Sequence, residues 1–413
     1  MIVNKVSIKD VCKFVGGSQP PKDVFSSKLK DGYIRLIQTR DFKTSDFLTY
    51  IPISLAKKRC DKDEVMIGRY GPPIFQVFRG LEGAYNVALM KAVPKSNILN
   101  DYLYYLLKQK EILTYVESLS LRTGGQTGVD LDSLNEYPVL LPDIPYQQKV
   151  AGVLKDLDEK IKINRQINSD LESIVKTLFD YWFVQFDFPD KNYNPYKSYK
   201  GEMTWNTKLN RQIPAGWTNG NLLDVGEVIG GSTPSRAHSE YFTKSGMSWI
   251  TPKDLSMNNG NKFITHGEID VSDLGLKSAS LKVMPKGTVL LSSRAPIGYM
   301  AISRDLVTTN QGFKSLIPKS GFSTPFVFYT VKNAIPDIIN NSCGSTFKEI
   351  SGSTLKTIEV CLPPKILIEQ FTKIAEPIFE KQSSVELENQ KLSALRDWLL
   401  PMLMNGQVKI EVN

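Results

Sequence analysis

Two polar, glycine-containing segments carry the side chains best suited to contacting an anion. They are residues 122–127, Arg-Thr-Gly-Gly-Gln-Thr, and residues 342–348, Ser-Cys-Gly-Ser-Thr-Phe-Lys. Each joins a cation and hydroxyl groups to backbone donors, and such groups hydrogen-bond to phosphates and base edges. A solvated loop would explain either segment alone. Because a similar loop recurs at the same place in both halves of the chain, we predict that both bind a ligand.

Residue patterns for catalysis are missing. The chain has no GxxxxGK[ST] phosphate loop, and the nearest strings to an adenine-methyltransferase tetrad, at 194–196 and 71–74, each fail by one residue. Histidine occurs only twice, and the four cysteines form no CxxC pair. We therefore assign no catalytic residue, no metal site and no cofactor to this chain. The thiols are expected to be free, which fits a reducing cytoplasm.

Most of the sequence occurs twice. IKDVCKFVGGS at 8–18 returns as LLDVGEVIGGS at 222–232, and the Gly-Gly pairs in these strings favour tight turns because glycine adopts positive φ freely. A period of about half the chain is longer than the roughly 20–50 residues of a solenoid unit, so two copies of one domain are predicted. Further identical residues keep the same order in both copies: Asp41 with Asp254, Arg69 with Arg294, and Asn86 with Asn310.

Composition sets broad limits on function. The 413 residues, 41% of them apolar and 23% charged, suit a globular protein of two or three domains. A net charge of +8 suits a polyanionic partner, although a basic solvated surface explains the charge equally well. No apolar stretch reaches the roughly 18–20 residues of a membrane span, and the first residues lack the regions of a signal peptide. We expect a cytoplasmic protein without a membrane partner.

Each copy alternates short β-rich runs with one helix, which predicts a mixed α+β domain. Turn residues bound the runs. In the first copy strands are predicted at YIRLIQ, EVMIGRY, IFQVF and YPVLLP, with a helix over 100–117. In the second copy strands are predicted at SWITP, TVLLSSR, MAIS, KSLIP and IEVCLP, with a helix over 325–340.

Two long helices with a coiled-coil seam follow the two copies. Steps of four and three residues from Val150 meet mostly apolar side chains as far as Trp182, and a second series runs from Phe371 to Leu399, each position 217 beyond its counterpart. We predict that these helices pack antiparallel, bringing Lys381 and Glu388 near two seam asparagines. Pro377 should kink the second helix or delay its start. The seam and docking residues are Leu154, Leu157, Ile161, Asn164, Asn168, Leu171, Trp182, Ile374, Ile378, Leu392, Leu395 and Trp398.

Combining these features divides the chain as follows: a first domain at 1–145, a central long helix at 146–184, a linker at 185–206, a second domain at 207–363, a C-terminal long helix at 364–405 and a tail at 406–413.

The order domain, helix, domain, helix resembles the DNA-specificity (S) subunit of type I restriction-modification enzymes. Specific strings carry the resemblance: GGSTPS at 230–235, SRAPIG at 293–298, LPP at 362–364 with Glu-Gln at 369–370, and LRDWLLPMLMNG at 395–406. The resemblance covers the whole chain and implies a pseudo-two-fold repeat of two target-recognition domains separated by two long antiparallel helices.

What the resemblance implies is a non-catalytic adaptor for double-stranded DNA. Each domain would read one half of an asymmetric bipartite target, and the helices would set the gap. Two methyltransferase (M) subunits would dock on the helices, and restriction (R) subunits would join where present. S-adenosylmethionine, ATP and Mg²⁺ would be bound by these partners. The predicted DNA-binding residues are Arg40, Arg69, Tyr70, Arg122, Gln126, Lys253, Arg294, Thr346 and Lys348.

Two other functions fit parts of the sequence. A fused methyltransferase or nuclease with drifted motifs predicts methyl transfer by the chain alone. A non-catalytic coiled-coil scaffold predicts no specific duplex binding. The exposure of Trp182 and Trp398 distinguishes these two hypotheses. An adaptor would present both side chains to a partner, whereas a scaffold would bury them in its core.

Overall fold

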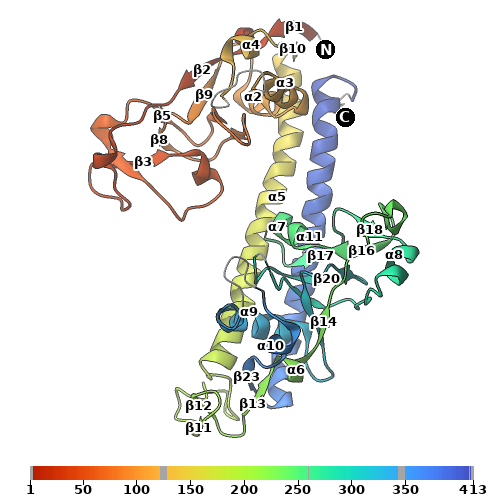
Figure 1. Ribbon diagram of the computed structural model, residues 1–413. Helices are drawn as coiled ribbons and strands as arrows, with labels where there is room; N and C mark the ends of the chain where they lie inside the picture. The colour runs from red at the N-terminus through yellow and green to blue at the C-terminus, as the bar shows by residue number, and fades with distance from the viewer. Residues whose placement is uncertain are drawn as a thin grey trace. The chain divides into compact units, whose positions relative to one another are not determined.

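The chain folds into two compact units. One contains Met1–Lys162 together with Lys391–Asn413, and the other contains Ile163–Gln390. The computed structural model describes residues 3–120, 128–258, 260–294, 296–342, 349–408 and 410. Each unit holds one mixed α+β domain and parts of two long helices (Figure 1).

The elements from the N-terminus to the first long helix are β1 (Val3–Ser7), α1 (Ile8–Val11), β2 (Cys12–Gly16), η1 (Lys22–Val24), β3 (Tyr33–Ile37), η2 (Thr39–Phe42), β4 (Tyr50–Pro52), η3 (Ile53–Leu55), β5 (Arg59–Cys60), β6 (Val65–Gly68), β7 (Val77–Phe78), β8 (Gly83–Tyr85), β9 (Leu89–Pro94), α2 (Asn100–Leu107), α3 (Lys110–Ser120), α4 (Leu131–Asn135), β10 (Pro138–Pro142) and α5 (Ile144–Phe179).

The elements after α5 are η4 (Asp180–Val184), β11 (Met203–Asn206), β12 (Arg211–Pro214), β13 (Thr218–Asn221), α6 (Leu222–Val225), β14 (Gly226–Gly230), η5 (Ser239–Tyr241), β15 (Phe242–Thr243), β16 (Met247–Ile250), α7 (Pro252–Met257), β17 (Phe263–Ile264), β18 (Asp270–Val271), α8 (Asp273–Ser278), β19 (Val289–Leu291), β20 (Met300–Ser303), β21 (Thr308–Thr309), β22 (Lys314–Pro318), α9 (Thr324–Asn340), α10 (Gly352–Lys356), β23 (Glu359–Leu362) and α11 (Lys365–Met404).

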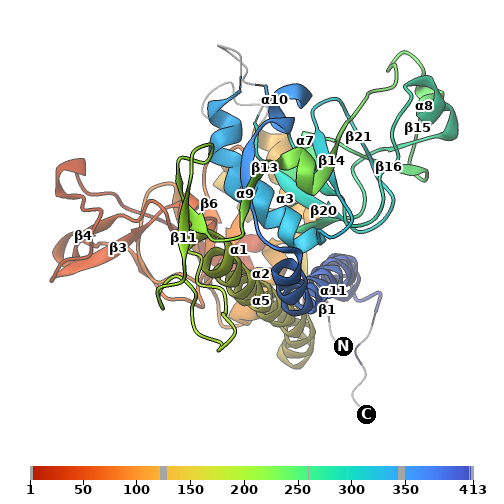
Figure 2. The same cartoon turned by 90° about the horizontal axis from the view of Figure 1, so that it is seen from below.

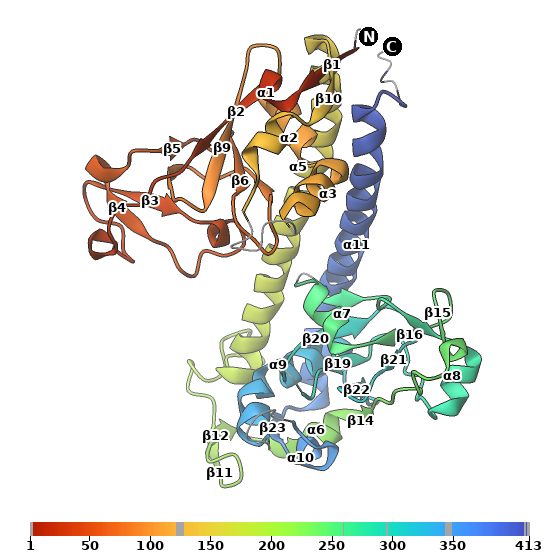
Figure 3. The ribbon, with the colours of Figure 1, turned by 45° about the horizontal axis from the view of Figure 1, so that its top comes forward.

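The first domain is built on two four-stranded sheets, with strand orders β2-β9-β6-β7 and β4-β3-β8-β5. The apolar and β-branched runs predicted as strands form β3, β6, β7 and β10, and the predicted helix forms as α2 and α3. Helices α2 and α3 lie beside the first turns of α5 (Figure 3), where Tyr102 and Leu103 share a core with Val150 and Leu154. This core fixes the domain on its helix.

The second domain repeats the plan with one strand more. Its main sheet has the order β14-β22-β19-β20-β17, beside a smaller sheet of β15-β18-β16-β21. The strands and the helix predicted for this copy all form. Helix α9 packs on β19 and β22, which Figure 3 labels; Figure 2 shows α9 from below. Helix α9 begins where the side chain of Ser323 accepts a hydrogen bond from the main chain of Phe326, as a serine N-cap does.

The strand registers confirm the internal repeat. Gly16 of β2 stands opposite Met90 of β9, and Gly230 of β14 stands opposite Lys314 of β22, both antiparallel. A parallel pair recurs as well, β3 with β8 in the first domain and β16 with β21 in the second, and the second domain adds the parallel pair β17 with β20. The two domains are therefore two copies of one backbone plan.

The two long helices run antiparallel within each unit. In the first unit, the Tyr146 hydroxyl near the start of α5 donates to the carbonyl of Val408, just after α11, at 3.0 Å. In the second unit, the Asn164 amide of α5 donates to Glu388 of α11 at 2.8 Å. Within each unit, residue numbers increase along α5 in the direction in which they decrease along α11, so the two helices are antiparallel, as predicted.

The seam of α11 differs from the prediction at every second position. The predicted residues Ile374, Lys381, Glu388 and Leu395 are exposed, whereas the residues that follow them, Ala375, Gln382, Asn389 and Arg396, are buried or half-buried. The spacing to α5 is therefore 221 residues, the spacing that relates β10 to β23, and not 217. The prediction placed Ile374 and Leu395 in the seam because they are apolar, but the sequence pattern alone does not reveal which face of a helix is covered.

Contacts of the two seam asparagines correct part of the prediction. Glu388 reaches Asn164 as predicted, but Lys381 is exposed, and Gln382 instead exchanges hydrogen bonds with Asn168 at 3.3 and 3.5 Å. Burial favours Gln382 here because an amide can pair with the backbone of the facing helix without carrying a charge inward.

Two further observations concern the expectations for Pro377 and for the tryptophans. Helix α11 begins at Lys365, well before Pro377, so this proline does not delay its start. Trp182 is buried in the second unit, where its ring lies 6.3 Å from that of Phe371, because the chain turns through η4 and folds the indole into the core. Trp398 keeps 55% of its surface exposed.

Candidate nucleic-acid interface

The paired Gly-Gly strings are explained by a close backbone approach. A Cβ atom on Gly17 would lie 1.9 Å from the carbonyl oxygen of Asn86, and a Cβ on Gly231 would lie 1.9 Å from that of Asn310. None of the four glycines has a positive φ, so the expected tight turns are not the reason for them. Glycine is needed because only hydrogen fits between these two segments of main chain.

The two asparagines form the other side of this contact. Asn86 Oδ1 accepts from the amide of Ala88 at 3.2 Å, and Asn310 Oδ1 accepts from that of Gly312 at 2.9 Å. Each asparagine thus closes a turn on which the glycine pair rests. The duplicated glycines and asparagines thus have a structural role in each domain.

The predicted binding loops leave each domain at equivalent points. Tyr70 forms an isolated bridge with Gly128, and Arg294 forms one with Glu349. One residue further, the amide of Val129 donates to the carbonyl of Arg69 at 3.1 Å, as the amide of Ile350 does to the carbonyl of Ser293 at 3.0 Å. Four predicted residues, Arg122, Gln126, Thr346 and Lys348, lie outside the described residues.

These bridges correct one pairing in the repeat. Sequence identity matched Arg69 with Arg294, but the hydrogen bonds match Arg69 with Ser293 and Tyr70 with Arg294. The strands agree, since β6 and β19 face their neighbours in registers 224 apart. The arginines were aligned by residue type, whereas register depends on the strand that precedes them.

Arg69 and Tyr70 lie together at the end of β6. The Arg69 guanidinium lies 5.4 Å from the centre of the Tyr70 ring, and Tyr70 is 38% exposed. A stacked cation beside a half-exposed ring can contact phosphates and bases at once. In the second domain Arg294 is half-buried at the equivalent strand end.

Arg40 and Lys253 stand at equivalent positions of two short helical turns. Asp41 closes one turn by accepting from the amide of Gln38 at 3.1 Å, and Asp254 closes the other by accepting from the amide of Thr251 at 2.8 Å. The duplicated aspartates are thus helix caps. They leave the preceding cation at the surface of its domain.

These two cations have different neighbours. The Arg40 guanidinium lies 5.7 Å from the ring centre of Phe47 and donates to its carbonyl at 3.3 Å. Lys253 donates to Glu268 at 2.5 Å, and this exposed partner raises the pKa of Lys253. Arg40 also lies 3.8 Å from the carboxylate of Asp41, and the side chains of Arg40 and Lys253 keep 50% and 65% of their surface exposed.

The predicted seam and docking residues divide by exposure. Leu154, Ile161 and Asn164 are buried between helices or against a domain. Three others on α11 point to solvent: Ile374 is 45% exposed, Leu395 43% and Trp398 55%. The half-buried members are Leu157, Asn168, Leu171, Ile378 and Leu392.

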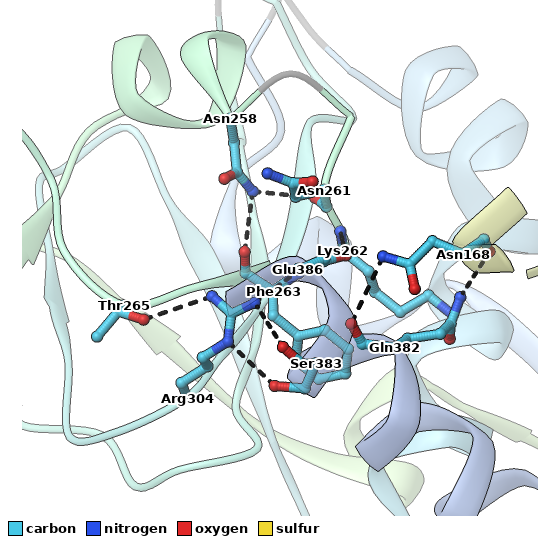
Figure 4. Close-up of polar contacts among 10 residues, drawn as sticks. All are labelled: Asn168, Asn258, Asn261, Lys262, Phe263, Thr265, Arg304, Gln382, Ser383 and Glu386. Carbon is cyan, nitrogen blue, oxygen red and sulfur yellow. Dashed lines mark hydrogen bonds and ion pairs between the residues drawn. The ribbon is translucent and has the colours of Figure 1, made fainter. Parts of the chain in front are cut away.

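Sequence reasoning missed a buried polar cluster that joins the second domain to both helices (Figure 4). Its main members are Lys262, Arg304 and Glu386, each at most 7% exposed. Burial raises the pKa of Glu386 and lowers that of Arg304, while the charge of each opposes the shift in the other. The sequence held no clear signal for this cluster, because neither Gln382 nor Glu386 lies on the predicted seam of α11.

Other kinds of site have little support in the described residues. Over that part of the chain no three His, Cys, Asp or Glu side chains are placed to share a metal ion, and no helix is long and apolar enough to cross a membrane. Burial raises the pKa of Cys12 to about 12 and that of Cys60 to about 11, which makes these free thiols poor nucleophiles.

Comparison with known proteins identifies the class. The family model for the type I restriction modification DNA specificity domain matches residues 3–173 and 214–396, and the chain belongs to this family. The resemblance proposed from the sequence is thereby confirmed. The two matched segments correspond to the two copies of the repeat.

Individual relatives agree. The chain is 38% identical to the MjaIX specificity subunit of Methanocaldococcus jannaschii over 216 residues, about half of each protein. It is 28% identical to the HindI specificity subunit of Haemophilus influenzae over 368 residues, 76% of this chain and 79% of that one. The S subunit structure from M. genitalium shares the fold, with a TM-score of 0.58 at 15% identity over 100% of this chain and 97% of that chain.

Proposed function

We propose that this chain is the DNA-reading subunit of a type I restriction-modification complex, with residues 1–145 and 207–363 each recognising one half of an asymmetric bipartite target. One observation carries the proposal. The two domains share a backbone plan, yet the side chain at the equivalent strand end is Tyr70 in one and Arg294 in the other. Two copies of one scaffold with different contact residues suit a split target whose halves differ.

The contacts would come from the strand ends and the loops that leave them. In the first domain these are Arg40, Arg69 and Tyr70 with the loop that carries Arg122 and Gln126. In the second they are Lys253 and Arg294 with the loop that carries Thr346 and Lys348. Arginine binds guanine edges or phosphates through bidentate hydrogen bonds. The difference between Tyr70 and Arg294 at equivalent positions would therefore give the two domains different base preferences.

The helices would provide the docking surface for two methyltransferase subunits. Exposed Ile374, Leu395 and Trp398 on α11 support this, because large apolar side chains on a polar helix are typical of an interface core. Adenine methylation, with its S-adenosylmethionine, would then belong to these partners. ATP, Mg²⁺ and DNA cleavage would belong to restriction subunits where they are present.

The test is co-expression with methyltransferase subunits, followed by mapping of methylated adenines. The expected result is a split sequence with a fixed gap. Methyl transfer by the purified chain alone would support a fused enzyme, and the absence of both methylation and specific duplex binding would leave the scaffold.

A single substitution tests the second half-site. Arg294→Ala should lower methylation at targets with the intact second half-site by about five- to 150-fold and relax the base preference there, since one bidentate contact contributes about 1–3 kcal/mol of discrimination. Lys277→Ala, an exposed change on α8 of the same domain, is the control and should leave methylation unchanged. Unaltered methylation by Arg294→Ala would remove this residue from the interface.

A further inference from the structure

The second domain is bound to α11 by a carboxylate whose hydrogen bonds all come from that domain. Glu386 accepts from the main-chain amides of Lys262 at 2.8 Å and Phe263 at 3.1 Å. Its other strong partner is the Arg304 guanidinium at 2.8 Å, which also donates to Ser383 at 3.0 Å (Figure 4). Two separate segments of the domain, one at the start of β17 and one just after β20, thus meet at one residue of the helix.

Lys262 extends the cluster to the other helix. Its ammonium donates to Gln382 of α11 at 2.8 Å and forms an ion pair with Glu172 of α5. The same ammonium lies 3.8 Å from the ring centre of Phe379, which adds a cation–π contact. One side chain of the domain therefore binds both helices at once.

Net stability is a poor explanation for such a cluster. Buried ion pairs recover little more than the cost of desolvating their charges, and well-packed apolar residues often serve as well. Buried ion pairs do restrict the orientation of the domain on its helices, because another packing angle would leave a buried charge without its partner. A domain held this way has one permitted orientation on its helices.

The first domain does not repeat this clamp, meaning Lys262, Arg304 and Glu386, at the corresponding described positions. The clamp uses β17, the fifth strand of a sheet that has only four strands in the first domain. At the spacing of 221, Glu386 corresponds to Arg165, which is exposed. The first domain instead meets its helices at Asp158 of α5, which accepts from the buried Tyr105 hydroxyl at 2.8 Å and from Arg396 of α11 at 2.7 Å.

We propose that Lys262, Arg304 and Glu386 are positioning residues that hold the second recognition domain at one angle on the helix pair and so determine which gap between the half-sites is accepted. This inference rests on the proposed function. One base pair displaces a half-site by about 3.4 Å and rotates it by about 35°. A clamped domain rejects that displacement, whereas a domain free to pivot follows it.

The experiment measures gap selectivity in the chain assembled with its methyltransferase subunits. Three duplexes carry the same mapped half-sites with the gap at its natural length, one base pair shorter and one longer. Glu386→Gln and Lys262→Met remove charge with little change of size. Glu376→Gln makes the same substitution at an exposed position of α11 and serves as control.

The expected result is a ratio of methylation rates, natural gap over altered gap, that falls at least tenfold in Glu386→Gln and Lys262→Met. Penalties for single base changes inside either half-site should stay as in the unaltered protein, and the control should keep the original ratio. Loss of a merely structural residue would lower methylation of all three duplexes in proportion and leave the ratio unchanged.

An unchanged ratio in a folded variant overturns the inference, as does a proportional loss on all duplexes. Should either variant fail to fold, Ser383→Ala removes only a supporting hydrogen bond of Arg304, and its ratio must still fall, by a smaller factor. If the unaltered complex prefers no bipartite duplex at all, the proposed function fails first, and that outcome is distinct from a preserved ratio.

Discussion

Replacing Gly231 by alanine should destabilise the second unit through a clash with main chain. The added Cβ would lie 1.9 Å from the carbonyl oxygen of Asn310 and 2.5 Å from that of Thr309, far inside van der Waals contact. Neither side can yield easily, because Ser232 donates to Thr309 and Asn310 donates to Ile250, both at 3.0 Å. Overpacking a rigid site costs about 1–3 kcal/mol and sometimes more. We expect about 3 kcal/mol, which corresponds to a fall in melting temperature of about 6–12 °C.

The neighbouring glycine provides a matched control. A Cβ on Gly230 would meet only the flexible end of Lys314, at 3.6 and 4.0 Å, so Gly230→Ala should change the free energy of unfolding by less than about 1 kcal/mol. Urea titration followed by circular dichroism compares the two variants. The first domain repeats the test, with Gly17→Ala destabilising and Gly16→Ala tolerated. Equal effects of the two substitutions within a pair would refute the packing argument.

Three further predictions concern the helices. Burial alone would raise the pKa of Glu172, but the ammonium of Lys262 holds this pKa at about 2. The ion pair therefore stabilises the folded state fully above pH 4.5, and this stabilisation is lost as the pH falls toward 2. Glu172→Gln should flatten the decline of the urea midpoint below pH 4.5. The double change Asn164→Leu, Asn168→Leu should raise the melting temperature while making helix alignment less faithful, measured by calorimetry and cysteine cross-linking; no change in either would contradict it. Trp398→Ala should weaken binding of methyltransferase subunits at least tenfold with an unchanged urea midpoint, as measured by calorimetric titration, whereas lower stability with intact binding would make this residue core.

Much of the fold could be predicted from the sequence because local pattern and burial agree there. YIRLI and KSLIP form β3 and β22, where β-branched and apolar side chains pack against neighbouring strands. The seam of α5 was also predicted, since Val150, Leu154 and Ile161 are both apolar and buried. Agreement fails on α11, where Ile374 is apolar but exposed and Gln382 is polar but buried.

The candidate site was less predictable for the same physical reason. Matching arginine with arginine paired Arg69 with Arg294, although hydrogen bonds place Tyr70 at the equivalent position. Glu386 and Lys262 could not be paired from sequence, because their contact joins residues 124 positions apart through the fold. The DNA contacts assigned to individual residues remain predictions that the substitutions above will test.

The division of the chain into units also affects its synthesis. The first unit needs residues of α11, which follows the second domain in the sequence: Arg396 pairs with Asp158 at 2.7 Å, and Leu403 and Met404 complete the core around Val150. Domains generally fold in order as they leave the ribosome. Here the segment translated first cannot bury its helix until α11 has emerged, so the first unit is completed only after the second domain has been translated. A truncated product lacking α11 would leave the apolar face of α5 uncovered in both units, which favours degradation of incomplete chains before they can assemble.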